Sequence, residues 1–142
     1  MPDIDTQALA EAVKDAMYGC DDASRGLGIQ VDAISPGCSR CSMTVRQDMI
    51  NGHNSCHGGF IFTLADSAFA FACNAGNRAT VALAAQITFI APARLGDVLI
   101  ATASEESRTR RTGVYDVKIA TDDGRDIALF RGNSYETKTS VI

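Results

Sequence analysis

The chain has 142 residues, of which 46% are hydrophobic, and it carries a formal net charge of −4 at pH 7. This length is enough for one domain that buries roughly two-thirds of its unfolded surface. We expect a single domain over residues 1–142, in which residues 1–24 form an N-terminal helix and its connection. Lys and Arg form no cluster dense enough to follow a phosphate backbone, which argues against a nucleic-acid partner.

The sequence also shows no targeting or membrane-spanning pattern. The chain starts with polar and acidic residues, unlike a secretory signal or a transit peptide. The longest apolar stretch, residues 60–73, is interrupted by Asp66 and is shorter than the ~20 residues that cross a bilayer. We therefore expect a soluble, cytoplasmic protein with no membrane partner. The five cysteines, an odd number without a secretion signal, are expected to be free thiols.

The first half of the chain predicts one helix and two strands. Residues 5–17 have the period of an amphipathic helix capped by Asp5 or Thr6, whose inward side chains are Leu9, Val13, Ala16 and Met17. Residues 19–24 end this helix. Residues 27–34 and 38–48 then predict two antiparallel strands joined by the turn sequence Ser35-Pro36-Gly37.

The second half predicts a long helix followed by four strands. Residues 49–56 form a polar loop, and the helix runs from His57-Gly58-Gly59 to about residues 74–76. The four strands are expected at residues 79–90, 98–106, 111–121 and 125–138. Because the long helix is apolar on most of its circumference, we expect an α+β fold in which a curved antiparallel sheet wraps around it. Exposed edges of that sheet favour self-association.

Asp66 is the only charged residue between Gly58 and Cys73. In a helix its neighbours three and four positions away are Phe62, Thr63, Phe69 and Ala70, and none of them neutralises a carboxylate. Burying an unpaired charge costs several kcal/mol or raises its pKa. Asp66 is therefore a candidate catalytic acid. Two structural alternatives remain open: an N-cap of a helix that begins at Ser67, or a carboxylate paired with a distant Arg.

Two other patterns suggest metal binding only weakly. Cys38 and Cys41 have CxxC spacing, but residues three apart in a strand point to opposite faces. His53, Cys56 and His57 form a cluster that lacks a fourth ligand. We therefore expect no metal site.

Several segments together resemble a known family. The residues Asn51-Gly52-His53, His57-Gly58-Gly59-Phe60 and Leu64-Ala65-Asp66-Ser67-Ala68-Phe69-Ala70 are similar in order and spacing to the signature of the phenylacetic-acid-degradation branch of hot-dog-fold acyl-CoA thioesterases. The downstream segments at residues 87–89, 96–99, 111–116 and 129–132 continue the resemblance. It covers nearly the whole chain after the first helix.

The resemblance implies a hot-dog fold, a single hot-dog thioesterase domain, and subunits that join their sheets edge to edge as a homodimer or homotetramer. It implies hydrolysis of an acyl-CoA thioester, with phenylacetyl- or hydroxyphenylacetyl-CoA as substrate and no further cofactor. The family uses the N–H of the residue matching Gly58 to polarise the thioester carbonyl. Asn51 matches the position of an amide that orients water or the thioester.

The residues themselves fit this chemistry. The free N–H groups at a helix start stabilise negative charge on oxygen, and Gly58 and Gly59 do not obstruct a substrate. Asp66 lies about 12 Å along the helix from Gly58, which is too far for both to act on one carbonyl. Two antiparallel copies of the helix remove this difficulty, so we expect a site shared between subunits. We add His57, Phe60 and Phe62 as further candidate site residues.

Some questions stay open from the sequence. Asp66 can act as a general base or as a nucleophile. Phe69, like Phe60 and Phe62, is an aromatic wall of the site or simply part of the core. The alternative functions are a non-catalytic acyl-CoA-binding or regulatory protein and a hot-dog hydratase. The candidates for binding the CoA phosphates, which are otherwise simply surface charges, are Arg94, Arg108, Arg110 and Arg111.

Overall fold

The computed structural model describes residues 5–142. Its elements in chain order are α1 (Thr6–Cys20), α2 (Asp22–Gly26), β1 (Gln30–Ser35), β2 (Cys38–Thr44), the 3-10 turn η1 (Gln47–Met49), α3 (Gly58–Asn74), β3 (Thr80–Phe89), β4 (Val98–Arg108), β5 (Thr112–Thr121) and β6 (Asp126–Glu136).

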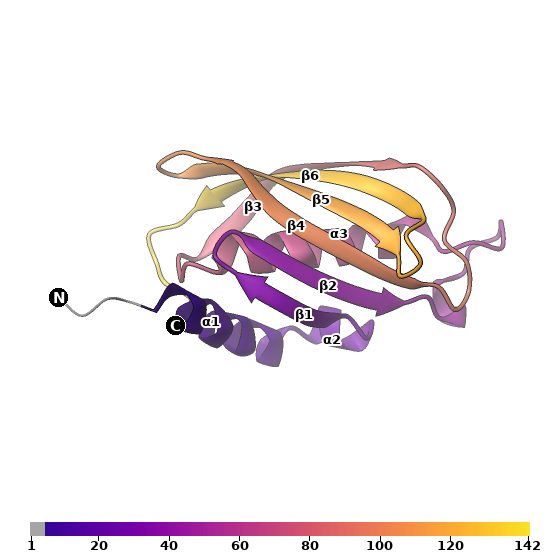
Figure 1. Ribbon diagram of the computed structural model, residues 1–142, viewed down its shortest axis with the longest axis horizontal. Coiled ribbons are helices and arrows are strands. Elements are labelled where there is room, and N and C mark those ends of the chain that lie inside the picture. Colours follow the sequence, from indigo (N-terminus) through magenta and orange to yellow (C-terminus); the bar gives the residue numbers. More distant parts are fainter. Residues whose placement is uncertain (1–4) are drawn as a thin grey trace.

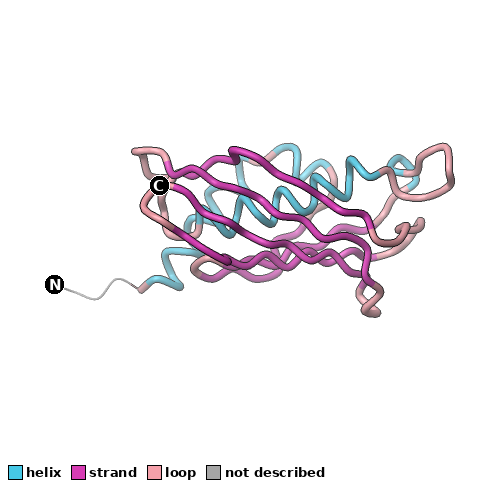
Figure 2. Tube along the Cα trace, turned by 90° about the horizontal axis from the view of Figure 1, so that it is seen from above, coloured by secondary structure: helices cyan, strands magenta, loops and turns pink. Residues whose placement is uncertain are grey.

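The six strands form one antiparallel sheet in the order β1-β2-β4-β5-β6-β3. The sheet curves along α3, which lies lengthwise behind the strands in Figure 1 and is seen from another side in Figure 2. Because α3 packs against all six strands, the core lies between this helix and the sheet. The expected α+β fold, a curved antiparallel sheet around one long central helix, is confirmed.

The long helix α3 is buried on one face only. The side chains inside the core are Ile61, Leu64, Ala65, Ala68, Phe69, Phe71, Ala72 and Asn74. Phe60, Thr63 and Ser67, which share a helical face with some of these residues, are only partly covered. The sheet therefore wraps one side of α3 and leaves a strip along the other side accessible.

The N-terminal region was predicted only in part. Asp5 caps α1, because its carboxylate accepts the N–H groups of Gln7 and Ala8 at 3.1 and 3.0 Å. Ala10 and Val13 are buried, but Ala16 is exposed, so its predicted inward position is wrong. The expected connection at residues 19–24 contains a second short helix, α2, which Asp21 caps by accepting the N–H of Ser24 at 2.9 Å.

The predicted strands are present, but several of their boundaries are shifted. β1 begins at Gln30 and not at residue 27, because Leu27 is the C-cap of α2. β2 ends at Thr44, because the chain then turns into η1, which has Arg46 as its N-cap. β4 continues to Arg108, because an irregularity between Glu105 and Ser107 absorbs one residue without ending the pairing with β5. Cys38 is exposed and Cys41 is buried, which confirms that the two thiols point to opposite faces.

Strand β3 forms one edge of the sheet and pairs only with β6. Large apolar side chains on it are exposed, with Val81 at 52%, Leu83 at 61% and Phe89 at 51% of their full accessibility. An irregularity between Ala82 and Ala84 places Leu83 as an extra residue opposite β6. Unpaired backbone groups beside exposed apolar side chains make this edge a surface with which another strand can pair.

Within residues 5–142, no helix is both long and apolar enough to cross a membrane.

Candidate functional site

His57 fixes the start of α3. Its Nδ1 accepts the N–H of Gly59 at 2.9 Å, and its carbonyl oxygen accepts the N–H of Phe60 at 3.0 Å. An accepting Nδ1 places the ring proton on Nε2. The backbone N–H of His57 donates to the carbonyl of Met49 at 2.7 Å. His57 is thus the N-cap of the helix, and this role occupies two of the N–H groups at the helix start.

The N–H of Gly58 has no acceptor among the described residues. A Cβ at this position would lie 2.8 Å from the ring of Phe89, at the end of β3. The helix start opens onto a cavity of about 450 Å³ lined by Ser55, Cys56, Gly58, Ile61, Phe89, Ile90, Ala91 and Pro92. Gly58 therefore offers a free donor beside a space that accommodates a small acyl group.

Asn51 organises the loop before the helix. Its Oδ1 accepts the N–H groups of His53 and Ser55 at 2.9 and 3.2 Å, and the hydroxyl of Ser55 at 3.3 Å. The side-chain carbonyl oxygen of Asn51 therefore stabilises the loop. Its Nδ2 donates to no residue in the described chain, so the amide NH₂ group is available to a ligand.

Asp66 lies in the middle of α3, half-buried, and not at a helix start, so the N-cap alternative is wrong. Across residues 5–142 its carboxylate has no hydrogen-bond or ion-pair partner, which also removes the alternative of an intramolecular salt bridge. Burial raises the pKa of Asp66 above its ordinary value of 3.8. A partly desolvated, unpaired carboxylate is a stronger base than one on an open surface.

One chain does not bring Asp66 and Gly58 together. Both lie on the same continuous helix, and eight residues at ~1.5 Å each separate them by about 12 Å. Burial, with a smaller contribution from the Asp66 charge, raises the pKa of the Cys73 thiol to about 12. That thiol stays protonated at neutral pH, so it is no competing nucleophile.

The predicted aromatic residues have different environments. Phe60 is partly exposed and meets the His57 ring edge-on at 6.0 Å, and Phe62 meets Phe130 in the same way at 5.4 Å. Gly59 is exposed. Phe69 is only 1% exposed, so for this residue the core interpretation holds and the role of a site wall is wrong.

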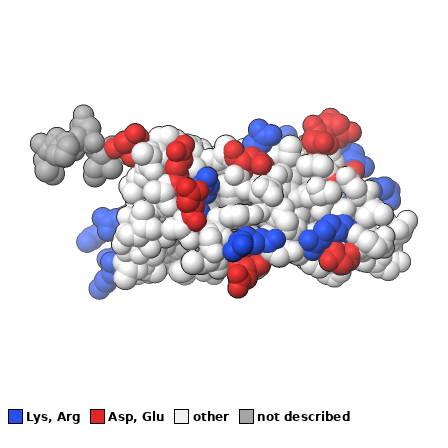
Figure 3. Space-filling model, turned by 90° about the horizontal axis from the view of Figure 1, so that it is seen from below, with Lys and Arg blue, Asp and Glu red and all other residues white. Residues whose placement is uncertain are grey.

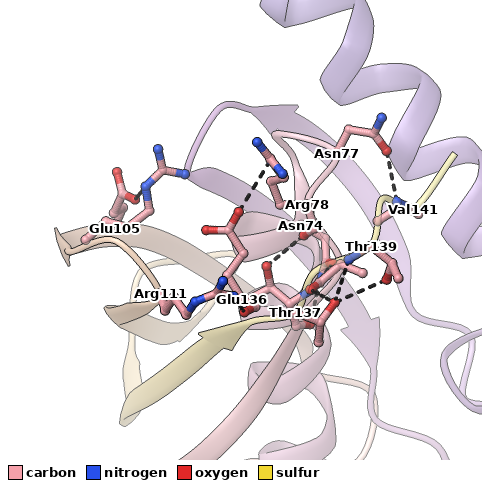
Figure 4. Close-up of polar contacts among 12 residues, drawn as sticks. Asn74, Asn77, Arg78, Glu105, Arg111, Glu136, Thr137, Thr139 and Val141 are labelled. Atoms are coloured by element: carbon pink, nitrogen blue, oxygen red, sulfur yellow. Dashed lines mark hydrogen bonds and ion pairs between the residues drawn. The ribbon is translucent and has the colours of Figure 1, made fainter.

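A second feature lies at the other end of α3, where a cleft of about 600 Å³ contains Arg78, Arg108 and Arg110 together with Glu105, Tyr115 and Glu136. Arg78 pairs with Glu136 at 3.4 Å, and Arg111 reaches the Glu136 carbonyl at 3.4 Å (Figure 4). Arg111 and Lys138 line an adjoining cavity of about 350 Å³.

Three of the four predicted arginines therefore come together. Arg94 does not join them, because it lies in the loop before β4 and the other three lie at or just beyond the opposite end of that strand. Arg78 and Lys138 were missed, since nothing in the sequence connects them with the β4–β5 turn. Elsewhere charges are mixed: Figure 3 shows acidic and basic side chains interspersed over one face.

No three His, Cys, Asp or Glu side chains of residues 5–142 are grouped so that they could hold a metal ion. Around the His53, Cys56 and His57 cluster, burial raises the pKa of the Cys56 thiol to about 11. The Cys56 thiol lies 3.6 Å from the carbonyl oxygen of its neighbour His57. The absence of a functional metal or cofactor stays a prediction.

Comparison with known proteins agrees with this geometry. Residues 53–128 match the thioesterase superfamily. The chain is 46% identical over 120 residues to the acyl-coenzyme A thioesterase PaaI of Escherichia coli K12, covering 84% of this chain and 86% of that protein. It is 35% identical over 101 residues to the human acyl-coenzyme A thioesterase 13, covering 69% and 71% of the two chains.

Solved structures give the same result. The structure of the E. coli PaaI protein superposes with a TM-score of 0.93 at 41% identity, over 95% of this chain and 98% of that one. A mutant of the phenylacetic acid degradation protein PaaI from Thermus thermophilus superposes with a TM-score of 0.77 at 35% identity, over 80% and 97%. The resemblance seen in the sequence is confirmed, and the chain belongs to the thioesterase superfamily, with the hot-dog fold of its PaaI-type members.

Proposed function

We propose that this thioesterase hydrolyses aryl-acetyl-CoA, such as phenylacetyl- or hydroxyphenylacetyl-CoA, to the free acid and CoA. The observation that carries the proposal is an unpartnered carboxylate, Asp66, on the same helix as an unpartnered N–H donor, Gly58. The acyl-CoA thioesterase names of the E. coli and human relatives support the substrate class. The phenylacetic acid degradation named for the E. coli and Thermus structures supports the aromatic acyl group.

The reaction follows from these two groups. The thioester oxygen accepts the Gly58 N–H, and the positive end of the helix dipole stabilises the negative charge that develops there. Asp66 either takes a proton from the water that attacks the carbonyl carbon, or attacks that carbon itself to form an anhydride that water then opens. In both routes the C–S bond breaks and CoA leaves as a thiol after receiving a proton. The free NH₂ group of Asn51 is placed to orient the water or the thioester.

The site is shared between two copies of the chain, which pair along the free edge of β3 as a homodimer. The 12 Å separation of Gly58 from Asp66 supports this arrangement, because one chain does not supply both groups to one carbonyl. The exposed apolar side chains on β3 support it as well. Further pairing into a homotetramer and a cytoplasmic location are expectations carried over from the sequence.

The position of Phe89 supports the shared site further. Its ring lies against Gly58, so the helix start is fixed to the last residue of β3. In an antiparallel pair of β3 strands, the last residue of one strand lies opposite the beginning of the other. The beginning of β3 follows the end of α3 by a few residues. Pairing two copies therefore brings each Gly58 toward the second half of the other α3, which begins near Asp66.

The arginine cluster is proposed to bind the CoA phosphates. Arg110 is exposed and pairs with no acid in the described chain. We expect Arg110→Ala to raise KM for acyl-CoA severalfold at low salt, with kcat unchanged, because phosphate contacts act on binding and are screened by salt. The matched control is Arg40→Ala, which removes an exposed arginine from β2. Equal KM values for both variants would remove the cluster from the proposal.

The pH dependence follows from the raised pKa of Asp66. Activity requires the carboxylate, so kcat should fall as pH drops through this pKa, at a higher pH than an exposed aspartate would give. A kcat–pH profile between pH 4 and 9 measures the acid limb. An acid limb at the ordinary aspartate value, near 3.8, would contradict the burial argument.

The proposed activity is tested by incubating the protein with phenylacetyl-CoA and measuring the release of CoA thiol with a thiol reagent. A blank without substrate is needed, because Cys20 and Cys38 are exposed free thiols. Rapid release is expected, with a specificity constant higher than for long straight-chain acyl-CoA. Preference for straight chains would overturn the aromatic substrate, and tight binding without release would identify a binding protein instead of an enzyme.

A further inference from the structure

Asn74, the last residue of α3, makes an unusual set of contacts with β3. Its Oδ1 accepts the N–H of Thr80 at 2.8 Å, and its Nδ2 donates to the carbonyl of the same residue at 3.1 Å. A further bond from Nδ2 to the carbonyl of Ala70, at 2.8 Å, holds the amide against its own helix. Thr80 is the first residue of β3. One side chain thus satisfies both backbone groups of a strand residue, as a neighbouring strand would.

The geometry of the neighbouring residue shows which edge this side chain occupies. The N–H of Ala79 donates to the carbonyl of Thr139, and its carbonyl accepts the N–H of Thr137, both in the segment that continues β6. Successive residues of a strand direct their backbone groups to opposite edges. The groups of Thr80 therefore point away from β6, toward the free edge of the sheet. Asn74 closes that edge at its first residue.

We propose that Asn74 is a positioning residue that acts as a strand-mimicking cap, ending the free edge of β3 at Thr80 and so setting the register in which β3 pairs with a second copy. This inference rests on the proposed function, which requires that copy. Because Thr80 already has both of its partners, an incoming strand can begin its hydrogen bonds only at Ala82, the next residue that faces the free edge.

The other end of the available edge is also closed. The N–H of Ile90 donates to the carbonyl of Ile127 on β6, and Pro92 has no N–H. Backbone groups alternate between the two edges, so, counting back from Ile90, those of Phe89, Ile87 and Ala85 face the free edge. The extra residue Leu83 shifts this alternation by one residue, so that the backbone groups of Ala82 also face the free edge. Residues 82–89 thus remain for pairing. Two identical antiparallel strands are symmetric about their midpoint, which lies at Gln86 because Leu83 is the extra residue of the irregularity and is not counted.

This register controls the shared site. A slip of two residues would move one strand along the other by about 7 Å, at ~3.4 Å per residue. It would move Gly58, which is held against Phe89, by the same amount relative to the partner's helix. Proton transfer or attack requires a contact of about 3 Å, so such a slip separates the carboxylate from the carbonyl. Asn74 touches no substrate and acts by holding this register.

Asn74 is also one of the few buried polar side chains in the described core, which are Ser24, Ser39, Asn74, Thr121 and Ser134. Each hydrogen bond of such a group contributes only about 1 kcal/mol net, but a fully satisfied polar group fixes one arrangement among several that apolar packing would allow. Fixing an arrangement is the role that the cap requires.

The register is tested by disulfide formation between copies. Single variants Ala84→Cys, Gln86→Cys and Thr88→Cys place a thiol on alternate residues of β3, and the wild type supplies the background from its own exposed cysteines. Opposite side chains have Cβ atoms about 4.5–5.5 Å apart, so Gln86→Cys, nearest to the axis, should give the most crosslinked dimer on oxidation. If Thr88→Cys gives the most crosslinked dimer, the proposed register is wrong, whatever the effect of the Asn74 variants.

The cap is tested by adding Asn74→Ala to each cysteine variant. We expect crosslinking to spread to positions 84 and 88, and kcat to fall at least tenfold with KM little changed. The isosteric Asn74→Asp keeps the acceptor for the Thr80 N–H and loses both donors, so it should give the same effects. It replaces Asn74→Ala in the test if the alanine variant folds poorly. The matched control is Thr121→Val, which removes a buried hydroxyl that bonds only within the β5–β6 turn.

Thr121→Val should lower Tm without changing the crosslinking pattern or kcat. If both Asn74 variants keep the wild-type crosslinking pattern and lose no more kcat than Thr121→Val, the cap is wrong, while an active wild-type dimer leaves the proposed function in place. A wild type that is monomeric or does not hydrolyse phenylacetyl-CoA would instead contradict the proposed function.

Discussion

Asp66→Asn is expected to lower kcat for phenylacetyl-CoA by several orders of magnitude without harming the fold. The amide has the size of the carboxylate but neither accepts a proton from water nor attacks a carbonyl, so the general base or nucleophile is lost. KM should change little, since substrate binding depends on Gly58 and on groups outside the α3 midpoint. Steady-state kinetics on the purified variant measure both constants.

Stability separates this result from a structural role. Folding raises the pKa of Asp66, so between its ordinary and raised values the folded state holds more protons, and stability falls as pH rises through that window. An uncharged Asn avoids this loss. Tm of Asp66→Asn should therefore equal or exceed the wild-type Tm at pH 7, and the difference should shrink toward pH 3. Activity within about tenfold of wild type, a change of only ~1.4 kcal/mol, would show that Asp66 is not catalytic.

Mixing two inactive variants should restore activity if the site is shared. Gly58→Ala places a methyl group against the ring of Phe89 and so displaces the backbone N–H that donates to the thioester carbonyl. The same variant keeps a normal Asp66. In a mixed dimer with Asp66→Asn, one site combines a normal Gly58 with a normal Asp66, and the other site has neither. Random exchange of subunits makes half of the dimers mixed, so about a quarter of the wild-type activity should return.

The measurement is thiol release before and after the two variants are mixed under conditions that let subunits exchange. The control mixes Asp66→Asn with itself at the same concentration, which should restore nothing. If the mixture stays as inactive as its components although mass spectrometry detects mixed dimers, each site belongs to one chain, and a single chain must bring both groups to the substrate by another route.

The periodicity of the sequence was enough to predict the helix-and-sheet architecture, because the apolar face of α3 and the alternation of Cys41, Met43 and Val45 are local signals. Asp66 was found for a related reason: a charge in an apolar run conflicts with burial, and the conflict is visible without a structure. The short helix α2 was missed, because five residues have no periodicity to detect and Asp21 looks like the end of α1.

Contacts between distant segments were harder to predict. Arg78 and Lys138 are sixty residues apart, and only the folded sheet brings them beside Arg111. The bonds of Asn74 to Thr80 were equally hidden, because they depend on where β3 starts relative to the helix end. His57 shows a different limit of sequence reasoning. A histidine suggests chemistry, whereas the structure shows that its Nδ1 caps the helix.

The exposed edge of β3 also determines how the newly made chain behaves before it meets a partner. Between residues 82 and 89 this strand has open backbone groups beside exposed Leu83 and Phe89, so it can pair with similar strands of unfolded or misfolded chains. If copies pair along β3 as proposed, correct assembly and aggregation compete for the same surface, and both accelerate with concentration. Recovery of soluble protein should then depend on keeping the concentration of unfolded chain low while folded copies accumulate, so slow addition of unfolded protein to the refolding buffer favours the assembled state.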